Sequence, residues 1–153
     1  MTFRGARAGD VPALVRLWRE MWDYHSALDP RYTTSVLAEK VMTAWMEEHL
    51  RSDRARILVA EDPKPVGYVC GMILENPPVV PWQFFGFISE IAVTERARRR
   101  GVGAGLLREI HFWFRSKRVP YVEVNVSVKN AVSRSFWRKS GYADFLERLR
   151  LEL

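Results

Sequence analysis

A segment rich in arginine and glycine is the part of the sequence best suited to bind a ligand. The apolar run Ile91-Ala92-Val93 leads to Arg98-Arg99-Arg100-Gly101-Val102-Gly103-Ala104, and apolar residues at helical spacing follow. Glycine has no Cβ, so the backbone here can turn tightly and approach a ligand closely. The first N–H groups of a helix lack intrahelical partners and attract anions. The order of strand, turn and helix therefore predicts a phosphate-binding loop.

Two simpler interpretations of this segment stay open. Arginine runs on a basic protein are often solvated surface, and glycines before a helix are often simple turn residues. The common phosphate-loop motifs do not match: the sequence contains no G-x-x-x-x-G-K-[ST], and G-x-G-x-x-G fails because Leu106 stands at the last glycine position. A phosphate loop of another kind is required.

The composition favours one domain with its own core, spanning residues 1–153. Of the 153 residues, 48% are apolar and 12% aromatic. Cys70 is the single cysteine, which excludes an intramolecular disulfide, and the three scattered histidines give no metal-type cluster, so we expect no metal. There is no signal-like N-terminus and no apolar run of membrane-spanning length. We therefore expect a cytoplasmic protein without a membrane partner.

The charge balance favours anionic partners. The chain carries 24 basic and 18 acidic residues, a formal charge of +6. The basic residues are spread along the chain, and no recognised nucleic-acid module accompanies them. We expect no nucleic-acid partner, and a nucleic-acid-binding module that uses the arginine loop is the alternative of another class.

The elements that would position the loop are mixed helices and strands. Periodicity and turn residues predict strands at 2–8, 56–60, 66–74, 84–93 and 121–128, and helices at 11–24, 102–117 and 131–139. Asp10 is expected to cap the first helix, and Thr34 or Ser35 to cap a second one that ends near Arg51. The alternating leucines of residues 142–153 predict a closing strand.

Three segments together resemble the GNAT superfamily of N-acetyltransferases. They correspond to its acetyl-CoA pyrophosphate loop with the preceding strand, to its first strand with the start of its first helix, and to its last core strand with the fourth helix. These segments are Ile91-Ala92-Val93 with Arg98-x-x-Gly101-x-Gly103, Phe3-Arg4-x-Ala6-x-x-x-Asp10, and Val126-x-x-x-Asn130 with Phe136 to Tyr142. The resemblance covers almost the whole chain. It implies an α/β fold of the α+β type, with a central mixed, mostly antiparallel sheet of six to seven strands and about four helices.

The resemblance also implies acetyl-CoA as co-substrate and residues that hold it. In this family the fourth and fifth strands separate, and the pantetheine pairs with the exposed backbone, here Ile91, Ala92 and Val93. The pyrophosphate would lie on the loop. The implied cofactor residues are Ile91, Ala92, Val93, Arg98, Arg99, Arg100, Gly101, Val102, Gly103, Ala104, Asn130, Ser133 and Trp137. Asn130 could equally be a plain helix cap.

The implied reaction is direct transfer of acetyl to a primary amine. The backbone N–H near Ile91 would donate to the oxyanion. Glu90 is the candidate base. With an ordinary pKa of about 4 it would act through a water or by orienting the ammonium. Alternatively, Glu90 has a structural role or holds the substrate, and Glu123 is the reserve candidate for the base. Trp137 stands where the family commonly has a tyrosine, and indole cannot donate a proton to the thiolate. A catalytically silent CoA-binding sensor therefore stays open.

The acetyl acceptor is the least determined part. Trp22, His25 and Tyr32 are candidate substrate-binding residues, with Glu123 as a fourth, and these aromatics could instead cover the core. No dense acidic cluster indicates a polyamine or an aminoglycoside. A small-molecule amine is the first expectation, and a protein N-terminus or lysine the second. The alternating tail also allows a homodimer.

Overall fold

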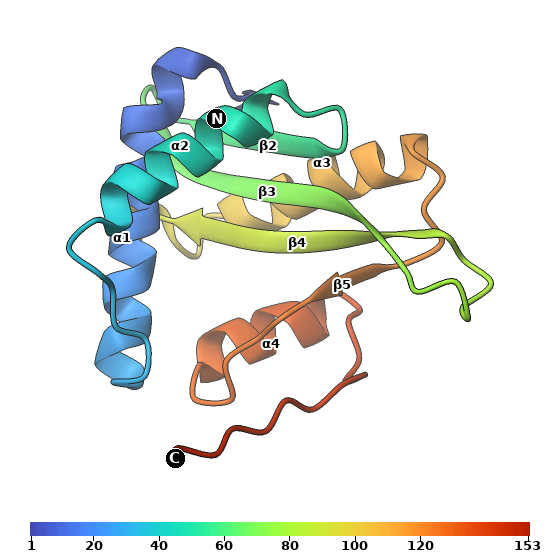
Figure 1. Ribbon diagram of the computed structural model, residues 1–153. Helices are drawn as coiled ribbons and strands as arrows, with labels where there is room; N and C mark the ends of the chain where they lie inside the picture. The colour runs from blue at the N-terminus through green and yellow to red at the C-terminus, as the bar shows by residue number, and fades with distance from the viewer.

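The fold is a five-stranded sheet with helices on both faces (Figure 1). The computed structural model describes all 153 residues. Helices α1 and α2 cover one face, and α3 and α4 cover the other. The strands are β1 (Thr2–Gly5), β2 (Ala55–Glu61), β3 (Pro65–Glu75), β4 (Phe84–Val93) and β5 (Val122–Val124). The helices are α1 (Val11–Leu28), α2 (Ala38–Arg51), α3 (Val102–Ser116) and α4 (Ala131–Lys139).

The strand order follows the chain, and only the last pair is parallel. Strands β1 to β4 form an antiparallel meander, and β5 returns parallel to β4 after the α3 crossover. The pairing of β4 with β5 runs from Gly86↔Val122 only to Ile88↔Val124. Beyond Ile88 the two strands part, as the family resemblance implied. Strand β4 therefore continues to Val93 with one open edge.

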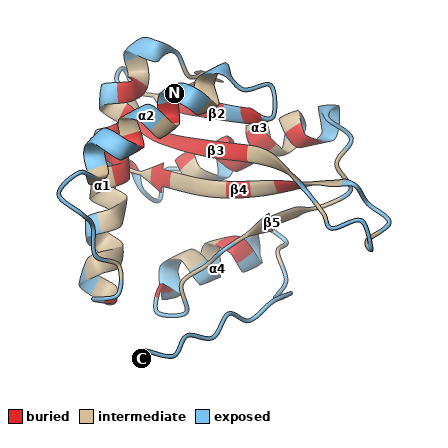
Figure 2. Cartoon of the chain, viewed as in Figure 1, coloured by how far each residue is buried: buried red, intermediate tan, exposed pale blue.

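Alternation along the strands divides the core into two layers. Tyr68, Cys70 and Ala92 pack with the apolar faces of α1 and α2, whereas Val69 and Ile88 pack with α3. Figure 2 shows burial along most of β3, at the centre of the sheet. Strand β4, which carries the candidate site, is thus paired along its length with a largely buried strand.

Most predicted elements are confirmed, with corrections at their ends. Strand β4 and helix α4 have the expected bounds, but α1 continues to Leu28 and β1 ends at Gly5. Asp10 is the N-cap residue of α1, as expected, but its side chain makes no bond to that helix, because its carboxylate accepts from Arg4 at 2.7 and 2.9 Å and from the N–H of Arg7 at 2.7 Å. The cap expected at Thr34 or Ser35 was wrong, since α2 begins at Ala38 without a side-chain cap. The strand expected over 121–128 is limited to Val122–Val124, because β5 leaves β4 there.

The C-terminal tail, residues 142–153, forms no strand. The sheet therefore has five strands where six to seven were expected. Leu149, Leu151 and Leu153 are exposed, because the tail runs past α4 without joining the sheet (Figure 1). Alternation predicted a strand from pattern alone, but a strand needs a partner edge as well. The homodimer stays a prediction.

None of the helices combines the length and the hydrophobicity that crossing a bilayer requires.

Candidate active site

The open edge of β4 presents backbone groups to the gap beside β5. Gly86 donates its N–H to Tyr121 on the β5 side at 2.9 Å, and Thr94 donates to Val66 of the β3 side at 2.9 Å. Successive residues of a strand bond in opposite directions, so by the β3 register the main chain of Ala92 faces β3 and that of Ile91 faces the gap. The N–H and C=O of Ile91 are thereby available to an extended ligand.

The loop after β4 carries a run of unbonded N–H groups. Arg99 and Gly101 have left-handed backbone, with φ of 58° and 78°. The N–H groups from Arg99 to Ala104 donate to no protein atom, and the first bonded one is that of Gly105, to the carbonyl of Gly101 at 2.9 Å. Six successive donors at a helix start form an anion-binding surface.

The three arginines of the loop, alike in the sequence, have different surroundings. Arg98 donates its Nε–H to the carbonyl of Val93 at 3.0 Å and lies over the ring of Tyr24. Arg100 pairs with Asp62 at 2.8 Å. Arg99 contacts no acidic side chain, so it is the arginine free to meet a phosphate.

The glycines of the loop also differ. Gly101 has open space around it, and its positive φ explains why glycine stands at this position. A Cβ on Gly103 would lie 3.3 Å from Cε2 of Phe136 in α4. A Cβ on Gly105 would clash with the ring of Phe3, so that glycine serves helix packing. Gly101 is therefore explained by its conformation and Gly105 by helix packing.

Glu90 lies on the α1 and α2 face of β4, partly buried. Its Oε2 accepts a hydrogen bond of 2.6 Å from the hydroxyl of Tyr68, which is fully buried. Burial raises the pKa of Glu90 to about 7, although the Tyr68 bond acts in the opposite direction. The ordinary pKa expected from sequence was wrong. A carboxyl that titrates near neutrality is a suitable general base.

The start of α4 holds the remaining candidate cofactor residues. Asn130 is a helix cap, with its Oδ1 accepting from the N–H of Ser133 at 2.9 Å. Its Nδ2 lies 3.3 Å from Nε2 of His25. The indole N–H of Trp137 donates to Oγ of Ser133 at 3.1 Å, and Trp137 is buried. Trp137 is therefore engaged with its own helix.

The aromatic candidates meet at the end of α1. Ring centroids lie 5.7 Å apart for Trp22 and Tyr32, and 5.2 Å apart for His25 and Tyr32. The indole N–H of Trp22 is buried without a hydrogen-bond partner. We call Trp22, His25 and Tyr32 the aromatic group, and its Trp22 packs against the core cluster that contains Tyr68 and Ala92.

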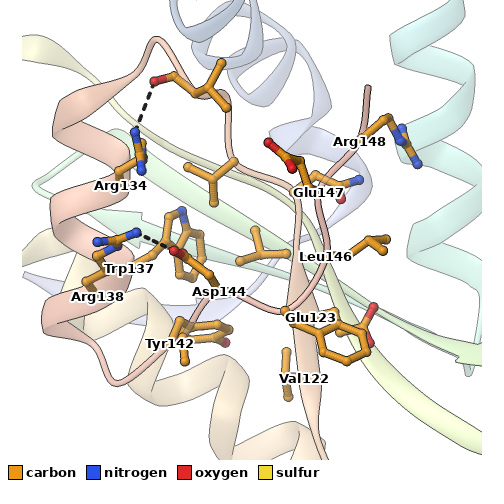
Figure 3. Close-up of a pocket in the computed structure, with 16 residues that line it drawn as sticks. Val122, Glu123, Arg134, Trp137, Arg138, Tyr142, Asp144, Leu146, Glu147 and Arg148 are labelled. Atoms are coloured by element: carbon orange, nitrogen blue, oxygen red, sulfur yellow. Dashed lines mark hydrogen bonds and ion pairs between the residues drawn. The ribbon is translucent and has the colours of Figure 1, made fainter. Parts of the chain in front are cut away.

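Glu123 does not join the aromatic group. It lies in β5 opposite Phe87 and lines a groove of about 540 Å³ between β5, α4 and the tail (Figure 3). Neither Glu90 nor any residue of the arginine and glycine loop lines this groove. The groove shares Trp137 with the candidate cofactor residues, but the loop and Glu90 lie outside it.

Sequence reasoning missed Tyr68, Glu20 and Asp62. Glu20 accepts the N–H of Glu95 at 2.7 Å and lies 3.8 Å from Arg98. These contacts join residues far apart in the chain, so no local pattern signals them. No group of three or more His, Cys, Asp or Glu is arranged to hold a metal ion.

Comparison with known proteins identifies the family. Residues 14–142 match the acetyltransferase (GNAT) family. The chain belongs to the GNAT family. By sequence alone it matches no curated protein. This GNAT chain is therefore placed by its family motif and by its fold.

Solved structures share the whole GNAT fold at low sequence identity. A mutant of BH1408 from Bacillus halodurans has a TM-score of 0.90 and 20% identity, covering 100% of this chain and 99% of that one. Aminoglycoside 6'-N-acetyltransferase AAC(6')-IG from Acinetobacter haemolyticus has a TM-score of 0.79 and 17% identity, covering 100% and 98%. AAC(6')-Iy in complex with CoA has a TM-score of 0.76 and 16% identity, covering 99% and 98%.

Proposed function

We propose that this protein is an acetyl-CoA-dependent N-acetyltransferase that acts on the primary amine of a small molecule. The observation that carries the proposal is the open edge of β4 at Ile91, next to six unbonded N–H groups from Arg99 to Ala104. Acetyl-CoA has an extended amide chain, which can pair with the open edge of β4. It also has a pyrophosphate, which can accept from the loop N–H groups. Family membership supports the same co-substrate.

The proposed placement assigns a role to each part of the site. The pantetheine pairs with the backbone of Ile91, and the pyrophosphate lies on the loop N–H groups with Arg99 as counter-charge. Arg98 and Arg100 hold the loop through Val93 and Asp62. Asn130, Ser133 and Trp137 form the wall at the start of α4. The three loop arginines, which the sequence suggested as equal cofactor residues, thus receive different roles in this proposal.

In the proposed reaction, Glu90 removes a proton from the substrate ammonium, directly or through a water. The free amine attacks the thioester carbonyl, a C–N bond forms, and the N–H of Ile91 donates to the oxyanion. The C–S bond then breaks to release the CoA thiolate, and the new amide nitrogen loses its second proton to that thiolate or to water. The CoA thiol has a pKa of about 8.5, so its thiolate can leave without a proton from the protein. The reaction therefore does not require an acid at position 137, where this chain has tryptophan.

The proposed acceptor is a small amine that packs against the aromatic group of Trp22, His25 and Tyr32. Several neighbours in fold are named as aminoglycoside acetyltransferases, one in complex with sisomicin, which supports a small-molecule acceptor. Asp29, whose backbone bonds to His25 and Tyr32, already has its carboxylate paired with Arg31 at 2.6 Å. Polycations therefore gain little here, and we propose an amine of low charge. A protein N-terminus or lysine is the second candidate acceptor.

A catalytically silent CoA sensor is the alternative supported by one observation. Trp137 replaces the usual tyrosine, and its N–H is bonded to Ser133. The experiment that separates the two functions is calorimetric titration with acetyl-CoA, followed by measurement of thiol release with a panel of amines. Binding with release supports the transferase. Binding without release on any amine supports the sensor, and absence of binding contradicts both.

A further inference from the structure

Tyr68 is a fully buried polar residue beside the candidate base. Its hydroxyl lies at the centre of the sheet, on the α1 and α2 face, and donates to Oε2 of Glu90 at 2.6 Å. That is the only hydrogen bond that the Glu90 carboxylate makes within the protein. One carboxylate oxygen is thus fixed, and Oε1 has no protein partner.

A β-bulge brings the two side chains together. The β3 and β4 register runs Gly71↔Ile88 and then Cys70↔Glu90, so Ser89 is the extra residue. The side chain of Ile88 packs on the α3 side. In a regular strand with no bulge at Ser89, Glu90 would point to that same side, because side chains two apart share a face. The bulge turns Glu90 to the face of Tyr68.

We infer that Tyr68 is a positioning residue for catalysis, whose hydroxyl holds Oε2 of Glu90 so that Oε1 is left for the acceptor amine or its water. The inference rests on the proposed role of Glu90 as base. A carboxylate held by one strong hydrogen bond loses rotational freedom, and it reaches the substrate in one orientation. Tyr68 itself stays protonated, because burial and the Glu90 carboxylate raise its pKa.

The same hydrogen bond keeps Glu90 available as a base at neutral pH. Burial favours the protonated carboxyl, and donation from Tyr68 to the charged form opposes that effect. Few other titratable groups face Glu90. Cys70 of β3 stays a thiol, because burial raises its pKa to about 12. Glu123 of β5 lies opposite Phe87 and lines the groove, which Glu90 does not line. Facing this part of the sheet, α1 and α2 present apolar residues such as Trp18 and Met46.

The first test is the pH profile of kcat/KM in Tyr68→Phe. Loss of the hydroxyl should move the acidic limb upward by about one pH unit. Activity should fall about fivefold at pH 7 and return to within about twofold of wild type at pH 9. A packing defect alone would lower activity equally at both pH values. That result, or an unmoved limb, overturns the inference.

The second test needs no acetyl transfer. The side-chain carbonyl carbon of Glu90, followed by ¹³C NMR in the ligand-free protein, should titrate at higher pH in Tyr68→Phe than in wild type. Tyr142→Phe is the matched control, since its hydroxyl contacts His111 on the other side of the sheet, and it should leave the midpoint unchanged. An equal midpoint in wild type and Tyr68→Phe overturns the inference, whether or not the protein acetylates an amine.

If Tyr68→Phe does not fold, the wild type still provides the test. The ¹³Cζ signal of Tyr68 should shift with the same midpoint as the Glu90 carboxyl, because the Tyr68 hydroxyl donates a hydrogen bond to that carboxylate. A Tyr68 signal that ignores the Glu90 titration contradicts the inference.

Discussion

The cofactor side and the acceptor side of the proposed site are built in different ways. The cofactor side consists of backbone groups from one continuous segment, from Ile91 to Ala104. The acceptor side consists of side chains from separate elements, with Trp22 and His25 on α1, Tyr32 after it, and Glu90 on β4. A backbone site tolerates sequence change, whereas a side-chain site changes with each substitution. Substitutions are therefore expected to alter acceptor binding more readily than cofactor binding.

The largest expected effect comes from blocking the backbone surface. Gly103→Val should weaken acetyl-CoA binding at least about 100-fold, or about 2.7 kcal/mol, because its Cβ would lie 3.3 Å from Phe136 and its methyls would cover the loop N–H groups. Gly9→Val is the control, since nothing lies within 4 Å of a Cβ there. Calorimetry measures binding, and thermal unfolding checks the fold. Near wild-type affinity in a folded Gly103→Val protein would refute the backbone site.

A substitution on the acceptor side should lower the turnover rate and leave the affinity for acetyl-CoA unchanged. Glu90→Gln should lower kcat roughly 100-fold or more, because the base is lost, with acetyl-CoA affinity unchanged within about twofold. Glu48→Gln, an exposed glutamate on α2, should leave both unchanged. Initial rates of thiol release and calorimetry give the two values. If Glu90→Gln turns over like wild type, Glu90 is structural.

A third comparison separates the loop arginines. Arg99→Ala should weaken acetyl-CoA about tenfold and reduce the salt dependence of binding, because Arg99 has no protein partner and is free to meet the pyrophosphate. Arg100→Ala should weaken it only about twofold, since Arg100 is paired with Asp62 on the surface. Titrations at two salt concentrations measure both. Equal losses would mean that Arg99 and Arg100 act alike, as the sequence suggested.

The smallest effect concerns stability as a function of pH. The pKa of Glu90 is raised by folding to about 7, above its ordinary value of 4.5. Between these values the folded state binds more protons than the unfolded state, so this group lowers stability as pH rises from 4.5 to 7. Glu90→Gln should therefore gain in melting temperature relative to wild type at pH 8 but not at pH 4. A constant difference across this range would contradict the raised pKa.

Sequence reasoning succeeded where local pattern determines structure. The bounds of β4 and α4 and the glycine turn before α3 depend on periodicity, glycine conformation and helix ends, all of which are short-range. It failed where a distant partner decides. The Asp10 side chain binds Arg4 instead of capping α1, the tail lacks an edge to join, and the pKa of Glu90 depends on burial under α1 and α2 beside Tyr68. The cofactor was therefore more predictable than the acceptor or the proton chemistry.

The most direct test of the central claim is an amide NMR titration of the ¹⁵N-labelled protein with acetyl-CoA. The account predicts that the largest shift changes fall on the N–H groups of Ile91 and of residues 99–104, with Gly105 and the tail nearly unmoved. Changes centred instead on the groove of Glu123, Arg138 and Leu146, with the loop amides unmoved, would contradict it.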